Sequence, residues 1–183
     1  MNSYKALNKQ FFTAGKYSIV PLWMEDRYDI MKWRNEQIYH LRQHKPLTTK
    51  DQNKYFETTV DGLFNTDQPD QILFSYLEND KCIGYGGLVR INWIDKNAEI
   101  SFIMNTDLEK ENFQKNGGIF LNLIEQVAFT DLKLHKISTY AFDLRPYLYD
   151  LFLESGFKEE ARLKEHCYFE GKYIDVVIHS KIK

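Results

Sequence analysis

Alternating apolar and polar residues recur along this chain. A half-buried strand needs such a period of two, because successive side chains point to opposite faces of a sheet. Gly84, Gly86 and Gly87 interrupt one alternating segment, which indicates a bulge or a close approach by a ligand or a neighbouring backbone. The pattern predicts seven strands, at about 16–22, 72–77, 82–91, 98–104, 136–142, 161–169 and 173–182.

Other segments carry the signals of helices. Thr48 followed by Asp51 resembles a capping box. Pro146 suits a first helical turn, and Gly156 suits a C-terminal cap. The order of elements predicts one domain over 1–183, with a core at about 16–182. We expect an α/β (α+β) fold, with about seven strands in a mixed central sheet flanked by about four helices. The predicted helices span about 25–35, 48–62, 117–129 and 146–154.

A glycine pair, Gly117-Gly118, stands at the head of the third predicted helix and shortly after the strand at 98–104. We expect the chain from Asn112 to Gly118 to form a loop that opens this helix. Glycines let the backbone N–H groups approach a ligand, and the helix dipole favours a phosphate or pyrophosphate there. An ordinary helix start with a flexible turn explains the same residues, so the motif alone leaves both interpretations open.

Composition and charge exclude several classes of protein. The chain of 183 residues is 43% hydrophobic and 27% charged, which is typical of a globular protein. Its net charge of −2 argues against nucleic-acid and membrane partners. Cys82 and Cys167 match no metal-ligand spacing, so we expect no metal. Because no signal-peptide or membrane-spanning pattern is visible, we expect a cytoplasmic protein, either monomer or homodimer.

Several short segments, taken in order, carry a resemblance to a known family. The chain resembles the GNAT superfamily of acetyl-CoA-dependent N-acetyltransferases over about 16–182, and within it the RimJ/RimL kind of ribosomal-protein N-terminal acetyltransferase and its sugar-nucleotide-acetylating relatives. The resemblance implies a GNAT fold, N-acetyltransferase activity and acetyl-CoA as co-substrate. The matching segments are Trp33-Arg34-Asn35, Ala98–Ile103, Gln114–Gly118, Ala128–Ile137 and Glu154–Phe157.

The resemblance also implies the residues that hold acetyl-CoA. The family's loop pattern, Gln/Arg-x-x-Gly-x-Gly/Ala, matches Gln114 and Gly117, whereas Ile119 replaces the second small residue. Backbone groups of the strand before the loop orient the thioester in this family. The residues expected to contact acetyl-CoA are therefore Phe102, Ile103, Met104, Gln114, Lys115, Asn116, Gly117, Gly118 and Ile119.

Two residues are candidates for proton transfer. Strand alternation places Glu99 on one face with Ser101, where its carboxylate can deprotonate the amine; a structural acid paired with a neighbouring cation is the alternative. The family's usual general-acid tyrosine falls on Phe152, which lacks a hydroxyl. Tyr149, one turn earlier, is the substitute candidate, and a core position explains it equally well. A thiolate leaving group tolerates the loss of a strong acid, because the pKa of a thiol is about 8.5.

The acceptor amine is expected near the first helix and the loop that follows it. Arginines there can bind an anionic group such as a nucleotide diphosphate, or pair with Glu36 and Asp51. We expect acetyl transfer to a primary amine of a small molecule such as an amino-sugar nucleotide. A ribosomal-type N-terminal acetyltransferase and a non-catalytic acyl-CoA-binding module are the alternatives. The candidate acceptor residues are Trp33, Arg34, Asn35, Arg42 and His44.

Overall fold

A computed structural model describes residues 2–183 and contains one mixed sheet of eight strands in the order β1-β2-β3-β4-β5-β6-β8-β7. Among the strand pairs formed by these residues, β5–β6 is parallel and the others are antiparallel. The α/β prediction is confirmed, and the additional strand, β1, has three residues, too few for alternation to reveal. The strands are β1 Phe12–Ala14, β2 Tyr17–Pro21, β3 Gln71–Glu78, β4 Lys81–Asn92, β5 Asn97–Met104, β6 Lys136–Phe142, β7 Lys158–Phe169 and β8 Lys172–Ile182.

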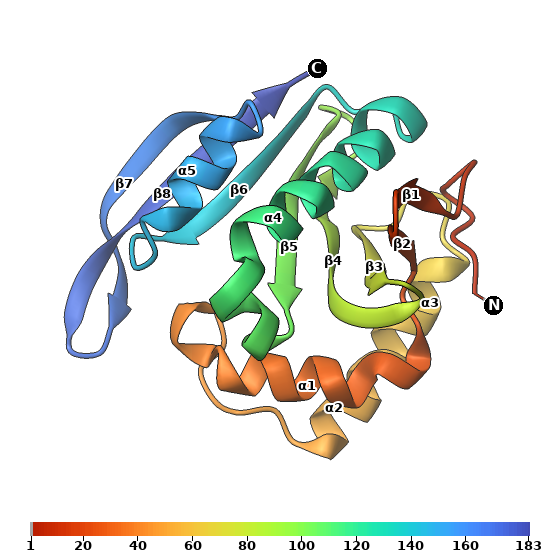
Figure 1. Ribbon diagram of the computed structural model, residues 1–183, viewed down its shortest axis with the longest axis horizontal. Helices are drawn as coiled ribbons and strands as arrows, with labels where there is room; N and C mark the ends of the chain where they lie inside the picture. Colours follow the sequence, from red (N-terminus) through yellow and green to blue (C-terminus); the bar gives the residue numbers. More distant parts are fainter. Residues whose placement is uncertain (1) are drawn as a thin grey trace.

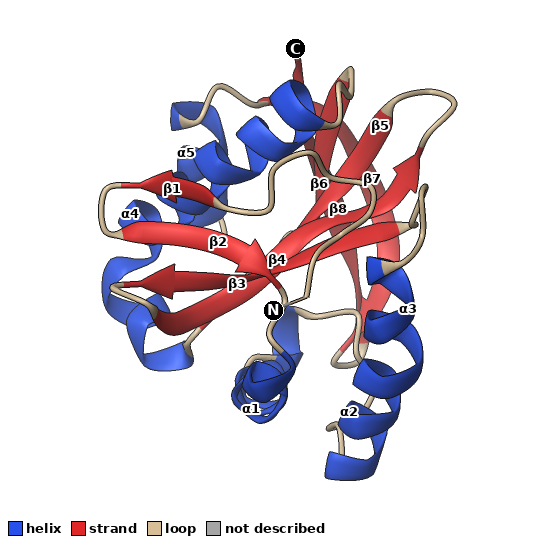
Figure 2. Ribbon diagram, turned by 90° about the vertical axis from the view of Figure 1, so that its right-hand side faces the viewer, coloured by secondary structure: helices blue, strands red, loops and turns tan. Residues whose placement is uncertain are grey.

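Helices cover both faces of the sheet. Figures 1 and 2 show α4 and α5 on one face and α2 and α3 on the other. The predicted capping box is confirmed, because the Thr48 hydroxyl accepts from the Asp51 N–H and the Asp51 carboxylate accepts from the Thr48 N–H. A π-helical turn, Phe56–Val60, joins α2 to α3. The helices are α1 Arg27–Glu36, α2 Thr49–Tyr55, α3 Asp61–Phe64, α4 Thr106–Glu125 and α5 Tyr147–Glu154.

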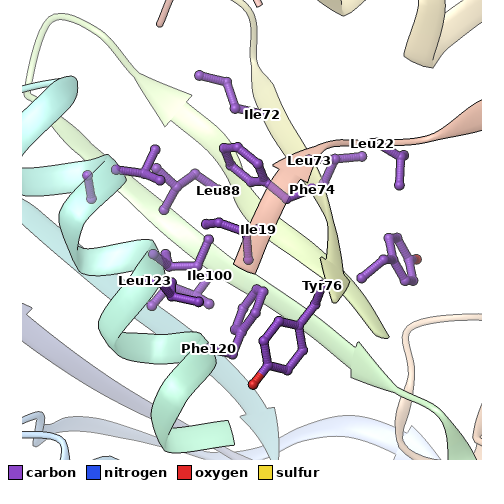
Figure 3. Close-up of a cluster of buried hydrophobic side chains, with 14 of the residues drawn as sticks. Ile19, Leu22, Ile72, Leu73, Phe74, Tyr76, Leu88, Ile100, Phe120 and Leu123 are labelled. Carbon is purple, nitrogen blue, oxygen red and sulfur yellow. The ribbon is translucent and has the colours of Figure 1, made fainter. Parts of the chain in front are cut away.

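The core lies between the sheet and α4. Leu88 of β4 and Ile100 of β5 point towards Phe120 and Leu123 of α4 (Figure 3). Phe120 also stacks on Phe102 with 4.1 Å between ring centroids. These buried apolar contacts hold α4 across the middle of the sheet and set the position of the chain that enters and leaves it.

The strand glycines mark a close approach of neighbouring backbones. A Cβ on Gly86 would lie 2.2 Å from the Ser101 carbonyl oxygen, and one on Gly87 would lie 2.0 Å from the Ile72 carbonyl oxygen. Gly87 also has a φ of 156°, which few other residues adopt. Of the alternatives that the sequence left open, the approach of backbone therefore accounts for these two glycines.

The prediction that α4 opens at the glycine pair was wrong. The helix begins earlier, where the Asn105 side chain accepts from the Asp107 N–H at 3.0 Å. Its helical geometry breaks at Asn112, with φ −133° and ψ 20°, and then resumes. Gly117 lies inside the resumed helix. A Cβ at this position would meet the Leu151 Cδ2 of α5 at 2.8 Å. The glycine accommodates helix packing rather than a turn.

Membrane-spanning helices and clusters of metal-ligating side chains are both absent from residues 2–183. None of the helices formed by residues 2–183 has the length and apolar character needed to span a bilayer. Within the same residues, His, Cys, Asp and Glu side chains form no group of three or more that could hold a metal ion.

Candidate active site

A cavity opens where β5 and β6 diverge. The two strands pair only between Asn97–Glu99 and Lys136–Ser138, after which β6 pairs with β8 alone among the described strands. Figure 1 shows the strands separating beneath α4. A cavity of about 140 Å³ lies between them and is lined by Ile100, Ser101 and Phe102 of β5. Backbone groups on this edge of β5 have no strand partner within residues 2–183, so they can hydrogen-bond to a substrate.

The cavity passes through the sheet from one face to the other. On the α4/α5 side its wall is apolar, with Phe113, Gly117, Leu121, Leu148, Leu151 and Phe152. On the opposite side the wall becomes polar, with His40, Arg42, Glu99 and Tyr140. One molecule can therefore enter along α4 and a second from the polar side, and the two can meet between the strands.

A second hollow surrounds the break in α4. Gln114 and Lys115 line it together with Tyr39 and Tyr147, and it shares Phe113 with the cavity. The Gln114 side chain donates to the Tyr147 carbonyl at 3.0 Å, which ties the break to α5. A cationic side chain beside interrupted helical backbone suits a phosphate group.

The remaining residues expected to contact acetyl-CoA line neither the cavity nor the hollow beside it. Ile103 and Met104 are buried. Asn116 is buried too; its carbonyl accepts from the Tyr76 hydroxyl at 3.1 Å, and its side-chain oxygen has no hydrogen-bond partner within residues 2–183. Gly118 borders a different hollow, and Ile119 packs against the core. The structure thus brings Phe102 and Gly117 to the cavity, and Gln114 and Lys115 to the hollow beside it.

Glu99 lines the cavity and is also paired with two cations. Its Oε1 forms an ion pair with Arg42, and its Oε2 accepts from Arg90 Nη1 at 2.8 Å. The side chain is only 11% exposed. The structure therefore shows the pairing with neighbouring cations that the sequence offered as one interpretation. The role of Glu99 as the base stays a prediction, which its place in the cavity lining allows.

Tyr149 lies outside the cavity lining. Its hydroxyl donates to Asp143, and its ring stacks on His179 with 5.2 Å between centroids. Burial and the hydrogen bond with Asp143 raise the pKa of Tyr149. Phe152, three residues later on α5, faces the cavity instead. The rings of Tyr149 and Phe152 both lie 5.2 Å from the His179 ring of β8, but of these two residues only Phe152 lines the cavity, so Tyr149 is described as a structural contact rather than the expected general acid.

Three of the five expected acceptor residues form the support of the loop after α1. Trp33 is buried in the core at 3% exposure. Arg34 donates to the Tyr85 hydroxyl at 2.6 Å, and its neighbour Asn35 accepts from the Leu47 N–H at 2.7 Å. These bonds fix the loop against the sheet, which is a structural role rather than the expected contact with an acceptor.

The other two expected acceptor residues lie on that loop. Arg42 reaches the cavity, whereas His44 is exposed and lies outside the cavity lining. Arg34 also donates to Gln43 at 3.0 Å, so the loop is anchored immediately after Arg42. Only Arg42 of the predicted cluster is therefore brought to the candidate site.

Sequence reasoning missed two titratable residues of the cavity. His40 is neutral at neutral pH, because burial and the positive charge of Arg145 lower its pKa to about 3. Tyr140 places its ring under the Arg42 guanidinium, 4.4 Å from the centroid, and burial raises its pKa to about 12. Alternation along the predicted strand at 136–142 gives the face of Tyr140, but the register with β5 comes only from the fold.

A mixed sheet whose parallel pair diverges over a cavity, with a broken helix beside it, is the architecture of an acyltransferase. The chain belongs to the acetyltransferase (GNAT) domain family, which it matches over residues 19–178. This confirms the expected class of enzyme, an N-acetyltransferase with acetyl-CoA as co-substrate.

Individual relatives show which acetyltransferases this chain is similar to. Spermidine N(1)-acetyltransferase from Vibrio cholerae serotype O1 is 33% identical over 94 residues, which cover 51% of this chain and 53% of that protein, so the match spans about half of the relative. The crystal structure of spermidine N-acetyltransferase from Vibrio cholerae with CoA and spermine has a TM-score of 0.78 at 21% identity, over 92% of this chain and 96% of that one.

A dodecameric structure of the Vibrio cholerae spermidine enzyme has a TM-score of 0.72 at 23% identity, over 92% of this chain and 95% of that one. At such identities the solved structures show the fold. The relatives named here are spermidine acetyltransferases and do not single out the RimJ/RimL branch.

Proposed function

We propose that this protein transfers the acetyl group of acetyl-CoA to a primary amine of a small aliphatic polyamine such as spermidine. The observation that carries the acetyl transfer is the cavity between β5 and β6, which joins an apolar wall on the α4/α5 side to a polar mouth with a carboxylate. The spermidine acetyltransferases among the relatives support a polyamine as the acceptor.

The charges near the mouth favour a cationic acceptor over an amino-sugar nucleotide. A nucleotide diphosphate needs cations that are free to bind it, but Arg34 is held by Tyr85 and Gln43, and Arg42 is paired with Glu99. A second cation of the cavity, Arg145, is paired with Glu109 at 3.1 Å. A polyamine instead needs a carboxylate. Glu99 is the carboxylate of the cavity, and because both of its oxygens are paired, with Arg42 and Arg90, a cationic acceptor must displace one of these partners.

The proposed reaction uses few groups of the protein. Unpaired backbone groups of Ile100–Phe102 orient the thioester carbonyl. The acceptor ammonium gives a proton to Glu99, directly or through a water, and the amine nitrogen then attacks the carbonyl carbon. A C–N bond forms as the C–S bond breaks, and the thiolate of CoA takes a proton from solvent. The nitrogen loses its remaining excess proton to solvent as the amide forms, and Glu99 releases the proton it took to solvent before the next turnover.

The test measures thiol release from acetyl-CoA with a panel of acceptors, and the product mass for one added acetyl group. The panel contains spermidine, spermine, an amino-sugar nucleotide and a peptide with a ribosomal-protein N-terminus. The highest kcat/KM on a polyamine supports the proposal. The highest kcat/KM on the sugar nucleotide or peptide overturns it. Thermal stabilisation by acetyl-CoA without thiol release in any reaction would instead indicate an acyl-CoA-binding module.

A further inference from the structure

A cation site is already visible at the polar mouth of the cavity. Glu99 and Tyr140 lie on the same face of the sheet, because Glu99 pairs with Ser138 in the parallel register and Tyr140 follows two residues later. Both line the cavity next to the thioester-facing edge of β5. A carboxylate beside an aromatic ring face is a combination that attracts an ammonium or guanidinium group.

A side chain of the protein itself occupies this site. The Arg42 guanidinium is paired with Glu99 Oε1 and lies 4.4 Å from the Tyr140 ring centroid. The phenol of Tyr140 is neutral at neutral pH, as a tyrosine ordinarily is, and burial raises its pKa further, to about 12, so the ring offers its negative face without a net charge. Arg42 therefore makes the contacts that a substrate ammonium would make.

Arg42 is also the cation that can leave this site. Its side chain is 38% exposed, and it belongs to the loop whose anchors are Gln43 and Leu47 rather than Arg42 itself. Arg90, the other partner of Glu99, is bound to Oε2 and does not line the cavity. Movement of Arg42 alone would free both Oε1 and the ring face while Arg90 still holds the carboxylate.

We propose that Glu99 and Tyr140 form the ammonium subsite for the acceptor, and that Arg42 fills this subsite as an internal competitor until a cationic acceptor displaces it. This inference rests on the proposed function and adds a contact that opposes acceptor binding. It reverses the effect expected when Arg42 is treated as an acceptor-binding residue. Removing Arg42 strengthens the binding of a polyamine instead of weakening it.

The test compares Arg42→Gln with wild type in two measurements: the KM for spermidine at saturating acetyl-CoA, and the Kd of spermidine for the CoA-bound protein by calorimetry. We expect both constants to fall about fivefold, the scale of an exposed ion pair. Arg42→Lys keeps a competing cation and should stay near wild type. Arg90→Gln removes the same charge without vacating the ring face, so its effect should be smaller than that of Arg42→Gln.

Tyr140→Leu in the Arg42→Gln background completes the design. Loss of the ring face should return the Kd of spermidine towards or above the wild-type value. A rise or no change of the spermidine Kd in folded Arg42→Gln overturns the inference, because Arg42 is then not a competitor. If spermidine binding tightens in Arg42→Gln but no variant acetylates a polyamine, the subsite stands and the proposed reaction fails.

Discussion

At the scale of single residues, our proposals assign both acceptor binding and proton transfer to the carboxylate of Glu99. Replacing it with glutamine keeps the shape but removes the proton acceptor and the negative charge. We expect Glu99→Gln to lower kcat by about 10²-fold or more at neutral pH, and to raise the KM for a polyamine. The rate should partly recover as the pH rises, because more of the acceptor is then the free amine.

Steady-state kinetics across pH check this prediction for Glu99. Glu160→Gln is a suitable control, since Glu160 also forms an ion pair on the sheet, with Lys136, but lies outside the cavity lining. A Glu99→Gln enzyme within twofold of wild type at neutral pH would place the base elsewhere, or make a protein base unnecessary.

His40 lines the same cavity and should make the stability of the folded protein depend on pH. Its pKa is lowered from 6.5 to about 3 in the folded protein, first by burial and then by Arg145. Between these values the unfolded chain binds more protons than the folded protein, so this residue makes the free energy of unfolding fall as the pH drops below 6.5. We expect His40→Gln to lose less stability than wild type on mild acidification.

Thermal or denaturant unfolding at neutral and mildly acidic pH measures the His40 effect. His44→Gln serves as the matched control, because this histidine is exposed on the following loop. The slope of stability against pH should be shallower for His40→Gln and the same as wild type for His44→Gln. Equal slopes for all three proteins would mean that His40 titrates alike in the folded and unfolded states.

At the scale of elements, α4 explains where sequence reasoning succeeds and where it stops. The alternation of β5 and the capping signal at Thr48 depend on neighbours in sequence, and both were predicted correctly. The start of α4 was missed because a glycine pair is a strong local signal for a turn. Only the contact of Gly117 with Leu151 shows that close packing between α4 and α5, rather than a turn, favours a residue without a Cβ there.

The residues of the candidate site also divide into those that local patterns could place and those that depend on how distant segments pack together. Glu99 and Phe102 both line the cavity, and alternation had assigned them to opposite faces of β5; their expected roles stay predictions. Tyr149 was misplaced, because its contacts with Asp143 and His179 depend on how α5 packs against the sheet, which no local pattern encodes. Tyr140 was overlooked for a related reason: its proximity to Glu99 arises from the parallel register of β5 and β6, which no local pattern encodes.

The two glycines of α4 offer a matched test of helix packing. Alanine is favoured over glycine by about 1 kcal/mol inside a helix. Gly118→Ala should gain much of this stability, since its Cβ would lie 3.7 Å from Leu151 Cδ1, an ordinary contact. Gly117→Ala should gain less and bind acetyl-CoA more weakly, because its Cβ pushes on a Leu151 side chain that lines the cavity. Denaturant unfolding and the Kd of acetyl-CoA measure both effects; identical behaviour of the two variants would remove Leu151 from the explanation.

At the scale of the whole molecule, the sheet consists of two parts that meet over a short seam. β1–β5 and β6–β8 are joined in the sheet only by the pairing of Asn97–Glu99 with Lys136–Ser138. Contacts of α4 with α5 and an ion pair of Lys181 with Glu125, at 2.7 Å, add to this seam. A ligand held between β5 and β6 would touch both parts, so it should strengthen their association.

We therefore expect acetyl-CoA to stabilise the molecule and to protect the seam. At a concentration about 100-fold above Kd, binding to the folded state alone raises the free energy of unfolding by about 2.7 kcal/mol. Hydrogen exchange should slow within residues 100–102 for the amides that point away from β4, because the thioester side of the ligand covers the open edge of β5. Adenosine diphosphate, which lacks the pantetheine and the acetyl group, should leave these amides unprotected. Protection that appears around α4 with both ligands, and never along β5, would mean that the thioester does not lie between the diverging strands.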